Sequence, residues 1–174
     1  SKCKKNSHLI FNGFRPKKLS NSRALTKDVV NFELKKTEKI FNKKYKYILL
    51  LQPTCPIRDY KKILKAIKLI KKNNIDTVLS IADVKANHPF RMKKMKNGFL
   101  KNFMDFKKEN MKPRQFLPKV YIRSGSFYLI TKESFNKCKS LVGKKCAGIE
   151  LFDNETINID TEDDFKYLKY KLKC

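Results

Sequence analysis

Apolar runs and helically spaced apolar positions alternate along this chain and predict a succession of strands and helices. The run 45–51 (YKYILLL) has the length and the aromatic and aliphatic content of a buried strand, and 76–84 (DTVLSIADV) is a second run of this kind. Between them, isoleucines recur at three- and four-residue spacing over 59–72, with Asp59 placed to cap a helix. This strand–helix–strand succession favours a parallel sheet with a right-handed crossover.

The N-terminal part of the chain predicts one short strand and one long helix. Residues 8–11 (HLIF) form an apolar run that ends at an Asn-Gly pair. A helix is expected from about Ala24 to Asn42, with Ser20-Asn21-Ser22 as its cap.

The segment 85–119 differs in character from its neighbours. It is polar and basic, contains three prolines and has a hairpin signal at Asn97-Gly98. We expect it to leave the sheet and to take part in a dimer contact.

Short strands and helices are predicted again towards the C-terminus. Strands are expected at 127–130, entered through 120–122, and at 148–152, with a short helix between them that Thr131 caps.

The last predicted elements carry acidic side chains. In 157–160 (INID) apolar and polar residues alternate, which turns Asn158 and Asp160 to the same side. Thr161 is expected to cap a final helix with an acidic first turn and a buried stripe of Phe165, Leu168 and Leu172.

Length and composition indicate a globular chain. The 174 residues are enough for a sizeable core, and 41% of them are hydrophobic, which argues against wholesale disorder. No stretch approaches the roughly 20 apolar residues of a membrane helix. We therefore predict one α/β domain over 1–174, with a mostly parallel sheet, in the cytoplasm.

The net charge of +26 is carried mainly by lysine, because only six of the 42 basic residues are arginine. Lysines are scattered along the whole chain, which favours solvated surfaces. A surface for polyanions such as nucleic acid, and a field that steers an anionic small substrate, stay open as alternatives.

The five cysteines form no CxxC pair and no zinc-site spacing. Incidental thiols in a reducing compartment are the simplest explanation. Cys55 follows a strand and could be a nucleophile, but neither His8 nor His88 is visibly tied to it.

Four blocks, in this order, resemble the acylneuraminate cytidylyltransferase (CMP-sialic acid synthetase) family. They are 14–16 (FRP), 50–58 (LLQPTCPIR), 113–115 (PRQ) followed by Tyr121 and 125–128 (GSFY), and 157–164 (INIDTEDD). The resemblance implies a doubly wound, Rossmann-like sheet of the nucleotide-diphospho-sugar transferase type. It also implies transfer of CMP from CTP to an acidic nine-carbon sugar with release of pyrophosphate, Mg²⁺ as cofactor, and a homodimer formed through 85–119.

The resemblance assigns roles position by position. Arg15 and Ser22 correspond to the nucleotide side, and Asp160 is the catalytic metal ligand, with Asn158 as its partner ligand. The sugar side comprises Gln52, Arg91, Arg114, Gln115, Tyr121 and Gly125. A guanidinium suits a carboxylate through its two-pronged geometry, and a carboxylate oxygen suits Mg²⁺.

Structural roles compete with several of these assignments. Arg15, Arg91 and the pair Arg114-Gln115 would also fit solvated loops, and Gln52 could simply end a strand. Asp160 could favour a helix N-terminus by its charge, which is also the expected role of the acidic run 162–164. His88 is expected to be structural.

The chain also departs from the family pattern. Asn158 stands where the family has the first of two aspartates, Ser124 replaces an asparagine, and Ser22-Arg23 replaces an Asp-Thr pair. The family's N-terminal strand and Gly/Ser phosphate loop do not occur in this sequence. We therefore expect a truncated chain with little or no turnover. The alternatives are a nucleic-acid-binding module and a non-catalytic sugar-binding or dimerising fragment.

Overall fold

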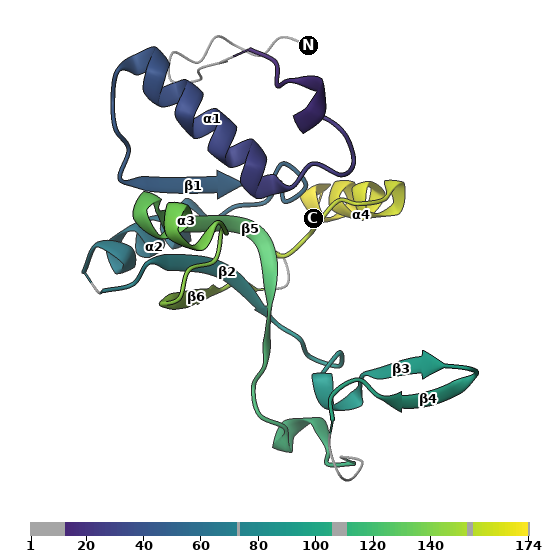
Figure 1. The fold of residues 1–174 in the computed structure, drawn as a ribbon. Coiled ribbons are helices and arrows are strands. Elements are labelled where there is room, and N and C mark those ends of the chain that lie inside the picture. Colours follow the sequence, from purple (N-terminus) through teal and green to yellow (C-terminus); the bar gives the residue numbers. More distant parts are fainter. Residues whose placement is uncertain (1–12, 73, 106–110, 153–154, 174) are drawn as a thin grey trace.

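The computed structural model describes residues 13–72, 74–105, 111–152 and 155–173, and it shows a sheet with helices on both faces and a separate hairpin (Figure 1). The strand predicted at 8–11 lies outside these residues. The elements in chain order are η1 (Lys17–Leu19), α1 (Thr26–Phe41), β1 (Tyr47–Leu51), α2 (Tyr60–Lys72), β2 (Thr77–Asp83), η2 (Pro89–Arg91), β3 (Lys93–Lys96), β4 (Phe99–Asn102), η3 (Arg114–Phe116), β5 (Tyr121–Thr131), α3 (Lys132–Cys138), β6 (Cys146–Glu150) and α4 (Glu162–Lys173).

The α/β class is confirmed, but the sheet is mixed. Its strand order is β1-β5-β2-β6, and β5 is antiparallel to both of its neighbours, whereas β2 and β6 are parallel. Three strands therefore run in one direction, as predicted, while β5 separates β1 from β2 and runs the other way. The strand predicted at 127–130 is longer than expected, because β5 has 11 residues and includes most of the segment that was predicted to lead into it.

Two apolar clusters lie on opposite faces of the sheet, because successive side chains of β5 point to opposite sides. Phe127 and Leu129 pack with Ala66 and Ile70 of α2 on one face. Ile130 packs with Val30 of α1 and with α3 on the other face. The helices therefore form an outer layer on each side of β5.

Helix α1 begins later than predicted and is not capped by the predicted residues. Its N-cap position is Leu25, which makes no side-chain capping bond, while 20–23 form bends and turns before it. Asn21 instead accepts a hydrogen bond from the Arg23 amide at 2.9 Å, a local turn that competes with helix capping. The helix ends at Asn42 in the left-handed conformation, φ 48°.

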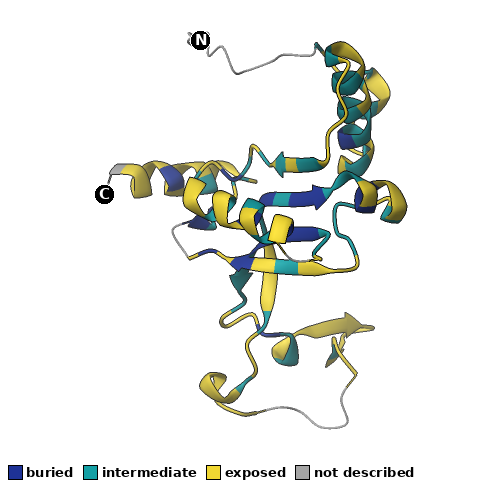
Figure 2. Cartoon of the chain, turned by 90° about the vertical axis from the view of Figure 1, so that its left-hand side faces the viewer, coloured by how far each residue is buried: buried dark blue, intermediate teal, exposed yellow. Residues whose placement is uncertain are grey.

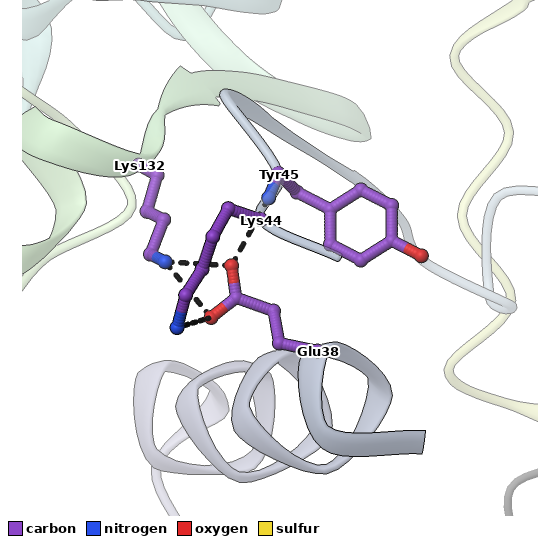
Figure 3. Close-up of polar contacts among 4 residues, drawn as sticks. All are labelled: Glu38, Lys44, Tyr45 and Lys132. Atoms are coloured by element: carbon purple, nitrogen blue, oxygen red, sulfur yellow. Dashed lines mark hydrogen bonds and ion pairs between the residues drawn. The ribbon is translucent and has the colours of Figure 1, made fainter. Parts of the chain in front are cut away.

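A carboxylate of α1 ties this helix to the rest of the fold (Figure 3). Glu38 Oε1 accepts hydrogen bonds from Lys132 Nζ at 2.6 Å and from the Tyr45 amide at 3.0 Å, and Lys44 Nζ lies 3.9 Å from Oε2. These contacts join α1 to the start of α3 and to the loop before β1. The hydrogen bonds from Lys132 and Tyr45 lower the pKa of Glu38 below its ordinary value of 4.5.

The other predicted caps are confirmed. Asp59 Oδ1 accepts from the Lys61 amide at 2.8 Å at the start of α2, and Thr131 Oγ1 accepts from the Ser134 amide at 3.2 Å at the start of α3. In α4, Thr161 Oγ1 accepts from the Asp164 amide at 3.2 Å, and the Asp164 carboxylate accepts from the Thr161 amide at 2.8 Å. This reciprocal pair is a capping box.

The predicted buried stripe of α4 is wrong for two of its three residues. Leu168 is buried, but Phe165 and Leu172 are 44% and 69% exposed. The helix forms as predicted, but Leu168 is the only buried side chain among its described residues, so periodicity alone overstated its packing.

The segment between β2 and β5 extends away from the sheet and is largely exposed (Figure 2). Its hairpin β3–β4 turns at Asn97 and Gly98, both with positive φ as predicted for this dipeptide. The buried His88 joins the two arms of the segment: its Nε2 lies 3.0 Å from the Pro118 carbonyl oxygen, and its Nδ1 accepts from the Phe90 amide at 3.2 Å. These bonds support the structural role expected of this residue.

Within the described residues, no helix has both the length and the apolar character needed to cross a membrane.

The Glu38 contacts predict a pH-dependent contribution to folding. Because its pKa is depressed in the folded chain, its stabilisation is present above the ordinary value of 4.5 and is lost as pH falls through the folded pKa. Glu38→Gln should therefore lower the urea midpoint at neutral pH, and the difference from wild type should shrink as the pH falls below 4.5. Glu33→Gln, on the same helix, is the matched control. If the urea midpoint of Glu38→Gln lies below that of wild type by the same amount at every pH, this account is contradicted.

Candidate functional site

Three segments that are distant in sequence meet beyond the carboxyl end of β1. They are the turn 52–58, residues 124–125 of β5, and the segment 157–160 before α4. The Thr54 carbonyl oxygen accepts a hydrogen bond from the Ile159 amide at 2.8 Å, which fixes the last segment against the turn. Two of the blocks that carry the family resemblance, 50–58 and 157–164, are thus neighbours in space.

The turn is held by hydrogen bonds to a single carbonyl group. The Gln52 carbonyl oxygen accepts from the Cys55 amide at 3.1 Å and also from Arg58 Nη2. Proline at 53 and 56 restricts the backbone on either side of Thr54 and Cys55. Arg58 is the last residue of the block 50–58, and no role was predicted for it from the sequence. Its position directly after the turn could have indicated that it closes the loop.

Gly125 allows β5 to approach the Gln52 side chain closely. Its φ is +80°, and a Cβ at this position would lie 2.6 Å from Gln52 Oε1 and 3.6 Å from Cys55 Sγ. Only glycine adopts this backbone conformation freely and leaves the space for the amide. The predicted sugar-side residues Gln52 and Gly125 are therefore in contact.

Cys55 is a buried thiol with a relative exposure of 1%. Its Sγ donates to Asn158 Oδ1 at 3.5 Å and lies 3.7 Å from the Ser124 carbonyl oxygen. Burial raises the pKa of the Cys55 thiol above its ordinary value of 9.0. A protonated thiol is a weak nucleophile, so this environment argues against the nucleophilic role.

Asn158 and Asp160 are on one side of their segment, as the alternation predicted. Asn158 and Asp160 are exposed and Ile157 is buried, and Asn158 Nδ2 donates to Asp160 Oδ2. Asp164 takes part in the capping box, and its hydrogen bonds from Thr161 lower its pKa. No group of three or more potential His, Cys, Asp or Glu metal ligands occurs in the part of the chain that the structure describes.

A cavity of about 350 Å³ lies between the start of α1 and the end of β1. Its lining includes Arg15, Asn21, Thr26 and Gln52. A residue predicted on the nucleotide side and one predicted on the sugar side thus face the same space. Ser22, the other residue predicted on the nucleotide side, is exposed in the neighbouring turn and is not part of this lining.

The remaining predicted site residues lie elsewhere in the chain. Arg91, Arg114 and Gln115 are exposed on the segment between β2 and β5, where Arg91 Nη2 donates to the Lys112 carbonyl oxygen at 3.3 Å. Tyr121 begins β5, and its hydroxyl donates to Glu150 Oε2 at 3.4 Å. The fold of one chain does not bring these residues to the turn after β1.

Comparison with known proteins identifies relatives at low identity. The chain is 24% identical over 156 residues to the post-translational flagellin modification protein B of Campylobacter coli, covering 89% of this chain and 65% of that protein. It is 25% identical over 118 residues to the N-acylneuraminate cytidylyltransferase of Streptococcus agalactiae serotype V, covering 67% of this chain and 28% of that enzyme. No family model matches the chain. The relatives' names support a relationship to sialic-acid-type cytidylyltransferases.

The contact between Gly125 and Gln52 predicts the effect of a single methyl group. Gly125→Ala should cost about 1–2 kcal/mol through the strained backbone alone, and it should also displace the Gln52 amide. Denaturant titration measures the first effect, and the side-chain amide resonances of Gln52 report the second. Gly98→Ala is the matched control, because Gly98 has the same φ of +80° but no atom within 4 Å of a Cβ. Unmoved Gln52 resonances in Gly125→Ala would contradict the contact.

Proposed function

We propose that this chain is a doubly wound cytidylyltransferase-type domain that acts on an acidic nine-carbon sugar of the sialic, legionaminic or pseudaminic acid type. The reaction transfers CMP from CTP to the sugar and releases pyrophosphate. The observation that carries the proposal is the convergence of Gln52, Gly125 and Asp160 at one edge of the sheet. In α/β sheets this edge, beyond the carboxyl ends of strands, is where ligands bind.

The cavity beside the turn supports a division between nucleotide and sugar. Gln52 offers an amide donor and acceptor at the strand end, which suits sugar hydroxyls, and it is held in place by Gly125. Arg15, which lines the same cavity, provides a fixed positive charge for a phosphate or carboxylate. The net charge of +26 would also attract both anionic substrates to the chain.

Asp160 is the residue that fits a magnesium ion. Its Oδ2 is occupied by the Asn158 amide, whereas its Oδ1 has no hydrogen bond among the contacts described. Mg²⁺ is commonly held by one or two carboxylates together with waters and substrate phosphates, so a single free carboxylate oxygen is a sufficient protein anchor. When bound, the ion would neutralise phosphate charge.

Two features limit what this chain can do alone. The sequence contains no Gly/Ser-rich loop to hold a triphosphate. In addition, β1 is at the edge of the sheet that the described residues form, with Leu49 and Leu51 38% and 40% exposed, and an apolar groove of about 390 Å³ lies between it and α1. An exposed apolar edge of this kind suits a further strand. We therefore propose that turnover by this chain alone is low.

The hairpin β3–β4 supports a homodimer. Its exposed apolar side chains include Met95, Phe99 and Leu100, and Met95 lies directly opposite Leu100 in the hairpin register. A second copy of the chain is the partner we propose for this surface. We also propose that the protein is located in the cytoplasm, because the free thiols of Cys55, Cys138 and Cys146 suit a reducing compartment.

The proposed reaction is tested by incubating the chain with CTP, Mg²⁺ and each of the three sugar acids. We expect binding of a sugar acid by calorimetry but little CMP-sugar by chromatography. Gln52→Ala should weaken sugar binding by roughly tenfold, because a hydrogen-bonding partner of the sugar is lost. Asn136→Ala is the matched control, since Asn136 carries an exposed side-chain amide on α3 and has no part in the proposed site. Failure of all three sugar acids to bind would count against the proposal.

The dimer is tested by sedimentation velocity. Leu100→Asp should convert dimer to monomer, because it places a charge in the proposed apolar contact. Leu172→Asp on α4 is the matched control, since this leucine is similarly exposed, at 69% against 66% for Leu100. A wild-type chain that sediments as a monomer at every concentration would refute the dimer.

A further inference from the structure

Three side chains connect the buried side of the candidate site to its exposed side through consecutive hydrogen bonds. The Cys55 Sγ lies 3.5 Å from Asn158 Oδ1 and 3.7 Å from the Ser124 carbonyl oxygen, and the shorter of these two contacts is the one to Asn158. Asn158 Nδ2 donates to Asp160 Oδ2. The backbone beneath them is fixed by the bond from the Ile159 amide to the Thr54 carbonyl oxygen at 2.8 Å. This series of hydrogen bonds therefore leads from Cys55, which is 1% exposed, to the Asp160 carboxylate at the surface.

The chemistry of the two neighbours determines the orientation of the Asn158 amide. A carboxylate accepts hydrogen bonds, so it requires the NH₂ group of the amide, and the amide oxygen then faces the Cys55 thiol, which is able to donate to it. The reversed amide would place its oxygen against the Asp160 carboxylate, where two acceptors repel each other.

We propose that Cys55 and Asn158 are positioning residues for Asp160, and that Asn158 is not a metal ligand. The amide oxygen of Asn158 faces the buried thiol and is turned away from a cation held at Asp160. Its NH₂ group instead fixes one oxygen of the Asp160 carboxylate and leaves the other oxygen free. This inference rests on the proposed function for the presence of a cation, but the hydrogen-bonded chain itself does not depend on it.

The proposal gives the turn after β1 a second role. Thr54 and Cys55 form the inner support of the proposed cation site, while Gln52 in the same turn faces the proposed sugar site. A single turn would thus set the position of both ligands relative to each other. Partners that orient a ligating side chain without touching the metal commonly change metal affinity by roughly 10–100-fold when they are removed.

The experiment uses the whole chain, with Mn²⁺ as the probe for binding and ¹⁵N NMR for the Asn158 side chain. Cys55→Ala removes the donor, and Cys55→Ser restores a donor at the same position. We expect Cys55→Ala to weaken Mn²⁺ binding roughly tenfold and to shift the Asn158 NH₂ resonances, and Cys55→Ser to recover most of both. Asp160→Asn supplies the background of Mn²⁺ bound elsewhere, and circular dichroism confirms that each variant is folded.

A double-mutant cycle separates positioning from direct ligation. If Cys55 and Asn158 act as one chain, Cys55→Ala combined with Asn158→Ala should weaken Mn²⁺ binding no more than either change alone. If Asn158 is a ligand, Cys55→Ala should leave Mn²⁺ affinity unchanged while Asn158→Ala reduces it, and this result would overturn the proposal. A wild-type chain that binds no Mn²⁺ would instead refute the proposed cation role. The Asn158 side-chain resonances would still test whether Cys55 and Asn158 are positioning residues. If these resonances are the same in wild type, Cys55→Ala and Asp160→Asn, the positioning role is refuted.

Discussion

The position of β5 between β1 and β2 is the constraint on which the rest of the structure depends. Phe127 and Leu129 supply the cluster under α2, and Ile130 supplies the cluster under α1 and α3. At the break in register between Leu79 and Ile81, the Ser80 hydroxyl donates to the Phe127 carbonyl oxygen at 3.1 Å and accepts from the Phe127 amide at 2.9 Å. This side chain replaces backbone pairing, so the strand passes through the bulge with its polar groups satisfied.

The same strand builds the candidate site. Because β5 runs antiparallel to β1, its residues before Phe127 continue past the carboxyl end of β1, where Gly125 meets Gln52 and the Ser124 carbonyl oxygen approaches Cys55. The Ile159 amide then holds the segment with Asn158 and Asp160 against the same turn. Packing in the sheet thus sets the position of side chains that the chain supplies from three distant segments.

Local patterns in the sequence predicted most elements and two of the site's segments. Some features depend only on neighbours within a few residues, so the sequence shows them directly. They are the strand ending at Leu51, the caps at Asp59, Thr131 and Thr161, and the shared side of Asn158 and Asp160. The reversed direction of β5 depends on pairing with residues 38 to 84 positions away, which periodicity does not report. The exposure of Phe165 and Leu172 likewise depends on the tertiary surroundings of α4, which helical spacing does not report.

The central claim is that the turn 52–58, with Cys55 buried within it and Gly125 next to Gln52, forms the acidic-sugar side of a cytidylyltransferase-type site. A titration of the ¹⁵N-labelled chain with N-acetylneuraminic, legionaminic and pseudaminic acid tests it most directly. The account predicts that at least one acid shifts the Gln52 side-chain amide and the Gly125 backbone amide at the same concentration, before resonances of the β3–β4 hairpin move. Saturable shifts confined to the hairpin, with Gln52 and Gly125 unchanged for every acid, would contradict it.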